Sequence, residues 1–178
     1  MERRVLLLGG LALSVLAPAA GHASSQHLMF EAIEGGRLDL AEFRGGPVLV
    51  VNTASRCGFT HQYDGLQALQ DAYGAEGLKV VGVPSDSFRQ ELDSAEAVRE
   101  FCEVNFGITF PMTTPVPVTG ARAHPFYRWA ADQGVVPKWN FHKILLDGDG
   151  QIAAEFSTRT PPDSPEISSA IEALLPRT

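Results

Sequence analysis

Cysteine is scarce in this sequence, and the motif typical of a protein disulfide oxidoreductase is missing. The 178 residues contain two cysteines, Cys57 and Cys102. The first is followed by Gly58, Phe59 and Thr60, not by a second thiol at the spacing that Cys-x-x-Cys requires. An exported enzyme that exchanges disulfides with other proteins is therefore disfavoured. A structural disulfide between the two cysteines and a pair of buried, inert thiols both stay open.

Other features are absent as well. No internal repeat, low-complexity block or linker interrupts residues 25–178, so a single domain is expected. Basic runs are lacking and the net charge is −7, which disfavours nucleic acid as a partner. No histidine has metal-ligand spacing with the cysteines, so no metal site is expected. A bound cofactor is not expected either. The histidines are His22, His27, His61, His124 and His142.

Only one long hydrophobic run occurs, from Val5 to Ala20, and it follows Glu2-Arg3-Arg4. A basic segment, an apolar run and small residues after it are the layout of a signal peptide. Residues 1–23 are thus predicted to be cleaved on export, leaving the mature domain, 24–178, in a bacterial periplasm. The paired arginines leave the general secretory and twin-arginine routes open. A membrane anchor is the weaker interpretation, because Pro18 interrupts the run and no second span follows.

Beyond this leader, the apolar pattern alternates between short buried runs typical of strands and the three-to-four spacing typical of helices. Strands are predicted at Leu28–Ile33, Arg37–Leu40, Val48–Asn52, Leu78–Val83, Lys143–Leu146 and Gln151–Phe156. Helices are predicted at Gly58–Tyr73, from Ser94 through Cys102, at His124–Ala131 and at Asp163–Leu175. A central strand and helix, a crossover, and a closing hairpin and helix indicate a thioredoxin-like α/β fold, with a central mixed sheet flanked by helices.

Cys57 falls where the central strand gives way to the first predicted helix. Its sulfur is expected in or just before the first helical turn, whose free N–H groups and positive dipole end favour an ionised thiolate. Arg56 adds a neighbouring positive charge. The position therefore favours a reactive thiol over a buried, inert one.

The residues around this thiol resemble a known family. Val51–Thr60, with the sequence VNTASRCGFT, resembles the peroxidatic motif of the glutathione peroxidases, with Cys in place of the selenocysteine that some members use. Lys138–Phe141 and Lys143–Asp147 resemble the second signature of that family. The resemblance runs from about Leu28 to Leu175 and implies a peroxidase with the thioredoxin-like fold.

The resemblance implies four active-site residues, Cys57, Gln90, Trp139 and Asn140. The two amides and the indole offer N–H groups that can hold the thiolate and the charge that develops on the leaving oxygen. The loop around Gln90 departs from the family pattern. Phe88 and Gln90 are separated by one residue where the family commonly has two, and Asp86 stands where the family usually has Asn. Gln90 is expected to reach Cys57 only if the backbone adjusts.

The resemblance also implies a catalytic cycle. The Cys57 thiolate attacks a hydrogen peroxide or organic hydroperoxide molecule, water or an alcohol leaves, and a sulfenic acid stays on the sulfur. The segment around Cys102 resembles the one that carries the resolving cysteine in the thioredoxin-dependent branch. A resolving Cys102 would form a disulfide with Cys57. That bond requires the helix of Cys102 to unwind in part, because the Cα atoms of two bridged cysteines lie within about 7 Å of each other.

The reducing co-substrate is expected to be a thioredoxin-like protein in the periplasm, or glutathione. The short connection between Trp129 and Trp139 lacks the loop that tetrameric relatives use for assembly, so a monomer is expected, with a dimer as the alternative. Two other functions stay open on sequence alone. One is a non-catalytic redox sensor or adaptor that the two cysteines switch, and the other is the disfavoured thiol-disulfide oxidoreductase.

Overall fold

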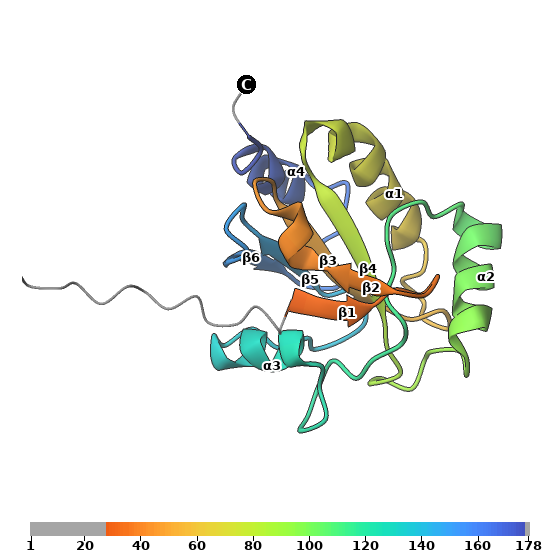
Figure 1. Ribbon diagram of the computed structural model, residues 1–178. Coiled ribbons are helices and arrows are strands. Elements are labelled where there is room, and N and C mark those ends of the chain that lie inside the picture. Colours follow the sequence, from red (N-terminus) through yellow and green to blue (C-terminus); the bar gives the residue numbers. More distant parts are fainter. Residues whose placement is uncertain (1–27, 177–178) are drawn as a thin grey trace, which may run out of the picture.

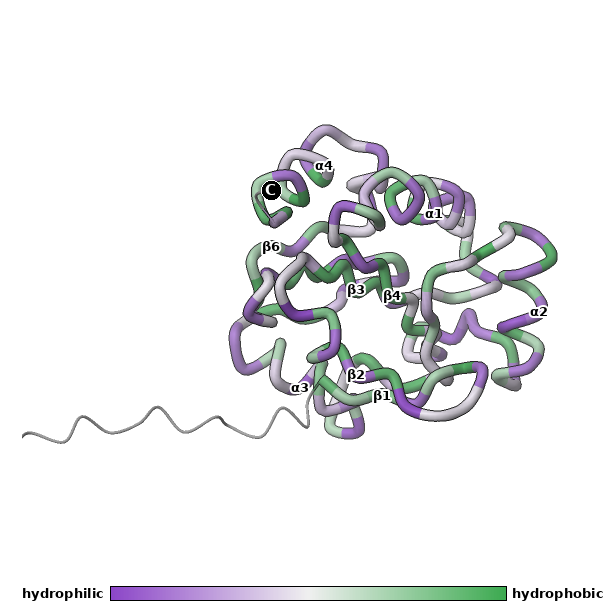
Figure 2. The backbone as a smooth tube through the Cα atoms, turned by 45° about the horizontal axis from the view of Figure 1, so that its top comes forward, coloured by the Kyte–Doolittle hydropathy of each residue, from purple (hydrophilic) through white to green (hydrophobic). Residues whose placement is uncertain are grey.

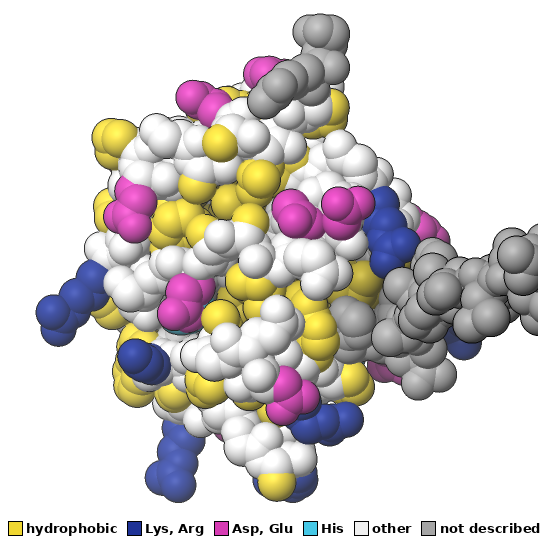
Figure 3. All heavy atoms as spheres, turned by 90° about the vertical axis from the view of Figure 1, so that its left-hand side faces the viewer, with side chains coloured by type: hydrophobic (Ala, Val, Ile, Leu, Met, Phe, Trp, Pro, Cys, Tyr) yellow, Lys and Arg dark blue, Asp and Glu magenta, His cyan; other side chains and the backbone are white. Residues whose placement is uncertain are grey.

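The computed structural model describes residues 28–176, so the predicted signal peptide lies outside the described residues. Within this part of the chain, no helix is both long enough and apolar enough to cross a membrane. Figure 3 shows one face of the molecule, on which the Lys and Arg side chains stand apart from one another, with acidic and uncharged side chains between them.

The centre of the protein is a four-stranded sheet in the order β4-β3-β5-β6 (Figure 1). The strand β3 (Val48–Thr53) pairs in parallel with β4 (Lys79–Pro84) and antiparallel with β5 (Lys143–Leu146). An antiparallel edge strand, β6 (Ile152–Phe156), completes the sheet. All six residues of β3 are buried, as expected for a strand covered on both faces. The predicted mixed sheet is therefore confirmed.

Two apolar cores fill the space above and below the sheet, because successive side chains of a strand point to opposite faces. Leu49 and Val51 face the first core, which α1 (Gln62–Tyr73), α4 (Pro165–Glu172) and α2 (Ala95–Phe106) cover with apolar side chains. The alternate residues of β3 face the second core, which α3 (Pro125–Asp132) and a small hairpin cover. Figure 2 shows α1 and α4 on one side of the sheet, with α3 and the hairpin on the other.

That hairpin consists of β1 (Met29–Glu31) and β2 (Arg37–Asp39), which pair antiparallel as predicted around Gly35-Gly36. Gly35 and Gly36 have φ of 94° and 82°, a left-handed conformation that glycine adopts without steric cost. The predicted second strand is one residue too long, because Leu40 begins a 3-10 helix, Leu40–Phe43, capped by Asp39. A second 3-10 turn, Gly74–Glu76, follows α1.

Two helix predictions differ from the structure at their ends. The first helix begins at Gln62 instead of Gly58, because the N–H groups of Thr60, Gln62 and Tyr63 bond three residues back and form successive turns. The last helix spans Pro165–Glu172 and not the whole of the predicted segment. The helices α2 and α3 begin after the caps Ser94 and His124, close to the predicted starts.

Candidate active site

The turn that carries Cys57 leaves the carboxyl end of β3 and is fastened to a second loop. The Ser55 N–H donates to Glu91 Oε1 at 2.9 Å, and the Arg56 N–H donates to the Gln90 carbonyl at 2.8 Å. Cys57 itself is 5% exposed and lies in the first core. Because α1 starts at Gln62, the predicted place of Cys57 in or just before the first helical turn is wrong. A non-helical turn separates the sulfur from the helix.

The loop between β4 and α2 brings Gln90 to this turn despite being one residue short. Arg89 has φ of 59°, a left-handed conformation that is uncommon for a residue with a side chain. The Asp86 carbonyl accepts from the Arg89 N–H at 2.9 Å, and the Asp86 carboxylate accepts from the Glu91 N–H at 3.2 Å. The positive φ at Arg89 thus accompanies a shortened loop that brings the backbone of Gln90 to the turn of Cys57.

Asn140 and Gln90 meet directly, although 50 residues separate them. Asn140 Nδ2 donates to Gln90 Oε1 at 2.9 Å, and the Asn140 side chain is fully buried. The Thr158 hydroxyl donates to the Asn140 carbonyl at 2.7 Å, and Asn52 Nδ2 donates to the Trp139 carbonyl at 3.0 Å. The structure therefore brings together the loops of Gln90, Trp139 and Asn140. No hydrogen bond joins these side chains to the Cys57 sulfur within residues 28–176.

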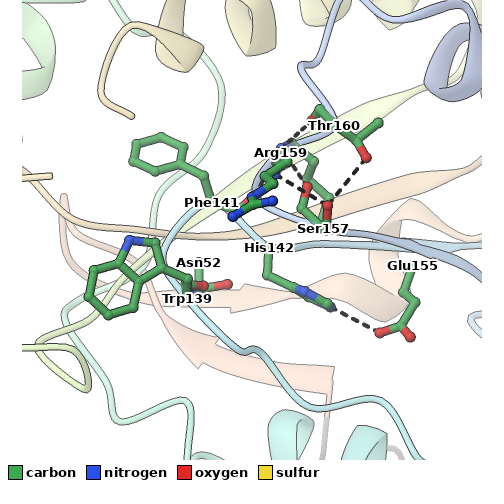
Figure 4. Close-up of polar contacts among 9 residues, drawn as sticks. Asn52, Trp139, Phe141, His142, Glu155, Ser157, Arg159 and Thr160 are labelled. Carbon is green, nitrogen blue, oxygen red and sulfur yellow. Dashed lines mark hydrogen bonds and ion pairs between the residues drawn. The ribbon is translucent and has the colours of Figure 1, made fainter. Parts of the chain in front are cut away.

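The Trp139 indole lies at the edge of this arrangement. Its side chain is 40% exposed, and its ring packs against Phe88, with 5.2 Å between the ring centroids. In Figure 4 the indole and the His142 imidazole point in different directions, and His142 turns toward Glu155. His142 Nε2 lies 3.1 Å from Glu155 Oε2. Burial lowers the pKa of His142, while Glu155 opposes that shift.

A cleft of about 500 Å³ opens beside Trp139. Its lining combines aromatic, basic and hydroxyl side chains from the site and from the loop that follows β6. The lining residues are Phe59, Lys138, Trp139, His142, Glu155, Ser157, Thr158 and Arg159. Such a mixture suits a small molecule with an apolar body and a polar end. No cluster of three or more His, Cys, Asp or Glu side chains that could hold a metal ion occurs among the described residues.

Glu91 is a site residue that the sequence analysis missed. It is 3% exposed, and its Oε1 atom accepts from the N–H groups of Ser55 and Leu92 at 2.9 and 2.8 Å. Burial raises the pKa of the carboxyl, although the bonds from Ser55 and Leu92 oppose this. The only signal in the sequence was its place directly after Gln90.

Cys102 lies in α2 and belongs to the same apolar core as Cys57. Both thiols are free, and Cys102 is 1% exposed. Burial raises the pKa of the Cys102 thiol to about 11, with smaller contributions from Glu91 and Glu103 that add to the rise and one from the Tyr63 hydroxyl that opposes it. The Tyr63 ring also packs against Phe106 of α2, with 5.0 Å between the centroids. Cys102 is therefore held as a neutral thiol beside the site.

Lys143 is the second site residue that sequence reasoning missed. The whole residue is buried, and its ammonium donates to Gln62 Oε1, the Thr160 carbonyl and the Phe141 carbonyl at 2.6, 2.7 and 2.9 Å. Burial lowers its pKa to about 7. A lysine that opens an otherwise apolar strand was the available signal, because such a charge needs partners when it is buried.

A buried thiol on the turn after a central strand, next to the loops that bring two amides together and close to a second free thiol in the same core, is the arrangement of a thiol-dependent redox enzyme. Comparisons with known proteins give the same class of enzyme. The family model described as glutathione peroxidase matches residues 26–131. The solved structure of Trgpx in apo form superimposes with a TM-score of 0.64 at 30% identity, covering 84% of this chain and 97% of that one. The thioredoxin-like fold is confirmed.

Relatives with curated names cover most of the chain. The glutathione peroxidase of Lactococcus lactis subsp. cremoris is 38% identical over 82% of this chain and 97% of its own length. The hydroperoxy fatty acid reductase gpx1 of Synechocystis is 40% identical over 81% of this chain and 91% of its own length. The chain belongs to the glutathione peroxidase family and is a thiol peroxidase. Family membership favours an enzyme over the non-catalytic sensor.

Proposed function

We propose that Cys57 is the peroxidatic residue and that Gln90, Asn140 and Trp139 assist it. The Cys57 thiolate attacks one oxygen of a hydroperoxide, and the O–O bond breaks. The other oxygen leaves with a proton as water or an alcohol, and Cys57 becomes a sulfenic acid. The observation that carries this proposal is the contact between Asn140 and Gln90, because it joins the two donor loops beside the Cys57 turn. Amide and indole N–H groups stabilise the charge on the leaving oxygen.

Cys102 then resolves the sulfenic acid. Its thiol condenses with the Cys57 sulfenic acid, a disulfide forms and water leaves. The presence of both cysteines in one core supports this step. The α2 helix supports it too, because most side-chain hydrogen bonds of α2 within the described chain, such as Arg99 to Glu103 and Asn105 to Phe101, stay inside the helix. The Tyr63 hydroxyl of α1 is the exception, since it interacts with the Cys102 thiol. Partial unwinding of α2 therefore breaks few polar contacts with the rest of the protein.

The disulfide is returned to two thiols by a thioredoxin-like protein, with glutathione as the alternative reductant. A dithiol reductant fits a cycle that ends in an internal disulfide. Hydrogen peroxide and organic hydroperoxides are the substrates. The name of the Synechocystis relative and the aromatic lining of the cleft by Phe59 and Trp139 support an organic hydroperoxide. The protein acts as a monomer in the periplasm after loss of residues 1–23.

A panel of steady-state assays tests the function. Wild type, Cys57→Ser and Cys102→Ser are assayed with hydrogen peroxide and cumene hydroperoxide, with thioredoxin and with glutathione as reductant. Cys57→Ser is expected to lose all turnover with each combination. Cys102→Ser is expected to lose most turnover with thioredoxin. Turnover retained by Cys57→Ser would overturn the assignment of Cys57, and unchanged thioredoxin-dependent turnover in Cys102→Ser would return Cys102 to a purely structural role.

A further inference from the structure

Lys143 is surrounded by neutral acceptors that come from three separate parts of the chain. Gln62 is the first residue of α1, Thr160 lies in the loop after β6, and Phe141 precedes β5. None of these three acceptors is a carboxylate, although an ammonium is costly to bury without a counter-charge. The three N–H groups of an ammonium match these three short contacts in number, and the Ser157 carbonyl lies at a longer distance of 3.5 Å. The Lys143 ammonium therefore connects the start of α1, the loop after β6 and the segment before β5.

The segment that follows Asn140 is one of the three. Phe141 has φ of 61°, which is an outlier for a bulky residue and persists only where the surroundings fix it. On one side, the Phe141 N–H donates to the Asn52 carbonyl. On the other side, the Phe141 carbonyl accepts from Lys143 at 2.9 Å. Lys143 thus fixes the peptide that links Phe141 to His142, one residue beyond Asn140.

A second path leads from Lys143 to the peptide of Asn140 itself. Gln62 accepts from Lys143 through Oε1 and donates through Nε2 to the Thr158 carbonyl at 2.7 Å. The Thr158 hydroxyl then donates to the Asn140 carbonyl at 2.7 Å. Asn140 is therefore held from both directions by contacts that begin at the same ammonium.

We propose that Lys143 is a positioning residue of the peroxidase site, which holds the Asn140 amide against Gln90 through Phe141 and through Gln62 and Thr158. This inference rests on the proposed roles of Cys57, Gln90 and Asn140. Lys143 does not touch the reacting atoms. A small displacement of a donor is enough to lower a rate by one to two orders of magnitude, so the loss of this lysine affects the oxidation of Cys57 at a distance.

A double-mutant cycle tests the proposal. Lys143→Met, Asn140→Ala and the double variant are compared by the second-order rate at which hydrogen peroxide oxidises Cys57, measured by stopped flow and normalised to the folded fraction. Lys143→Met is expected to slow wild type by about 10- to 100-fold and the Asn140→Ala protein by less than about 2-fold. Equal losses in the two backgrounds, or no loss in wild type, would overturn the proposal, because a purely structural role does not depend on Asn140.

Two further variants keep the test decisive. Thr158→Val removes only the hydroxyl that bonds the Asn140 carbonyl, and it replaces Lys143→Met in the cycle if that variant does not fold. The same dependence on Asn140 is expected, and its absence counts against the proposal. Lys79→Met is the matched control, because the Lys79 ammonium lies over the Phe43 ring and outside this network. Its rate is expected to equal that of wild type.

Together with the Cys57→Ser variant, the double-mutant cycle distinguishes a failure of the positioning role of Lys143 from a failure of the proposed function. If Cys57→Ser abolishes oxidation while the cycle shows equal losses, the positioning role of Lys143 is wrong and the proposed function stands. If Cys57→Ser still consumes peroxide at the wild-type rate, the proposed function is wrong.

Discussion

Cys57 and Cys102 share one apolar core, but the segments that carry them are held in different ways. The Cys57 turn is bonded through consecutive N–H groups to the loop of Gln90 and Glu91, 34 to 36 residues away in sequence. In contrast, α2 packs on the protein mainly through apolar side chains, and apart from the interaction of Cys102 with the Tyr63 hydroxyl, its side-chain hydrogen bonds within the described chain are local to the helix and its cap. The Cys57 thiol is thus on a turn that is hydrogen-bonded to a distant loop, whereas the Cys102 thiol is on a helix that packs mainly through apolar contacts.

The difference corresponds to the demands of the two proposed chemical steps. Cleavage of an O–O bond requires donors that are already in place when charge develops. Disulfide formation requires Cys102 to travel, so its helix must come from the part of the protein that opens locally at low free energy. We therefore expect perturbations of the two regions to change different quantities: stability and peroxide oxidation for the first, the rate of disulfide formation for the second.

The largest effect is expected at Glu91. Glu91→Ala leaves the N–H groups of Ser55 and Leu92 without their acceptor, and we expect a loss of about 3 kcal/mol in the free energy of unfolding. Glu103→Ala, at an exposed residue of α2 paired with Arg99, is the control and is expected to cost less than about 0.5 kcal/mol. Urea unfolding of both variants measures the contrast. Equal losses would remove the distinction between the two regions.

The next effect concerns the protonation of Cys102. Its folded pKa of about 11 lies above the ordinary value of 9.0, so the folded state keeps a proton that the unfolded state releases. Stability is therefore lost as pH rises from 9 to 11, by about 2 kcal/mol near pH 10.5. Cys102→Ala is expected to flatten this part of the curve in urea unfolding, and Cys57→Ala is the matched comparison. An unchanged slope in Cys102→Ala would show that the thiol is not held neutral by burial.

The smallest effect is expected at the start of α2. Ser94→Ala removes the hydroxyl that accepts from the Ala97 N–H, and caps of this kind contribute about 1 kcal/mol. Easier opening of α2 is expected to speed disulfide formation after one peroxide pulse about 5-fold. Acid quench and alkylation follow that rate. Ser164→Ala removes the equivalent cap from α4 and is expected to leave the rate unchanged. A similar acceleration in both variants would point to general destabilisation.

Much of the fold could be predicted from the sequence. Each of the strands β3, β4 and β5 contains a short run of buried, mostly aliphatic residues, and runs of that kind give a clear signal. The start of α1 was not predictable in this way, because the segment between Cys57 and Gln62 forms local turns whose N–H groups bond three residues back, and the apolar spacing does not separate such turns from a helix. Periodicity describes a helix once it has formed and carries less information about its first residue.

The site was only partly visible in the sequence. The set of Gln90, Trp139 and Asn140 came from resemblance to a family, whereas their contacts depend on Arg89 and Phe141, two non-glycine residues with positive φ. Neither side chain favours that conformation, so no local pattern indicated it. Glu91 and Lys143 were missed for a related reason. Ser55 bonds Glu91 and Gln62 bonds Lys143 across 36 and 81 residues of sequence, and only the folded backbone brings these pairs together.

One measurement tests the central claim, which is that Cys57 reacts with the peroxide and Cys102 then forms a disulfide with it in the same catalytic cycle. The reduced protein is treated with one equivalent of hydrogen peroxide, free thiols are alkylated, and the digested peptides are identified by mass spectrometry. The account predicts a disulfide between Cys57 and Cys102 within a single chain as the main product. A stable sulfenic acid on Cys57, with Cys102 recovered as the alkylated thiol, would contradict it.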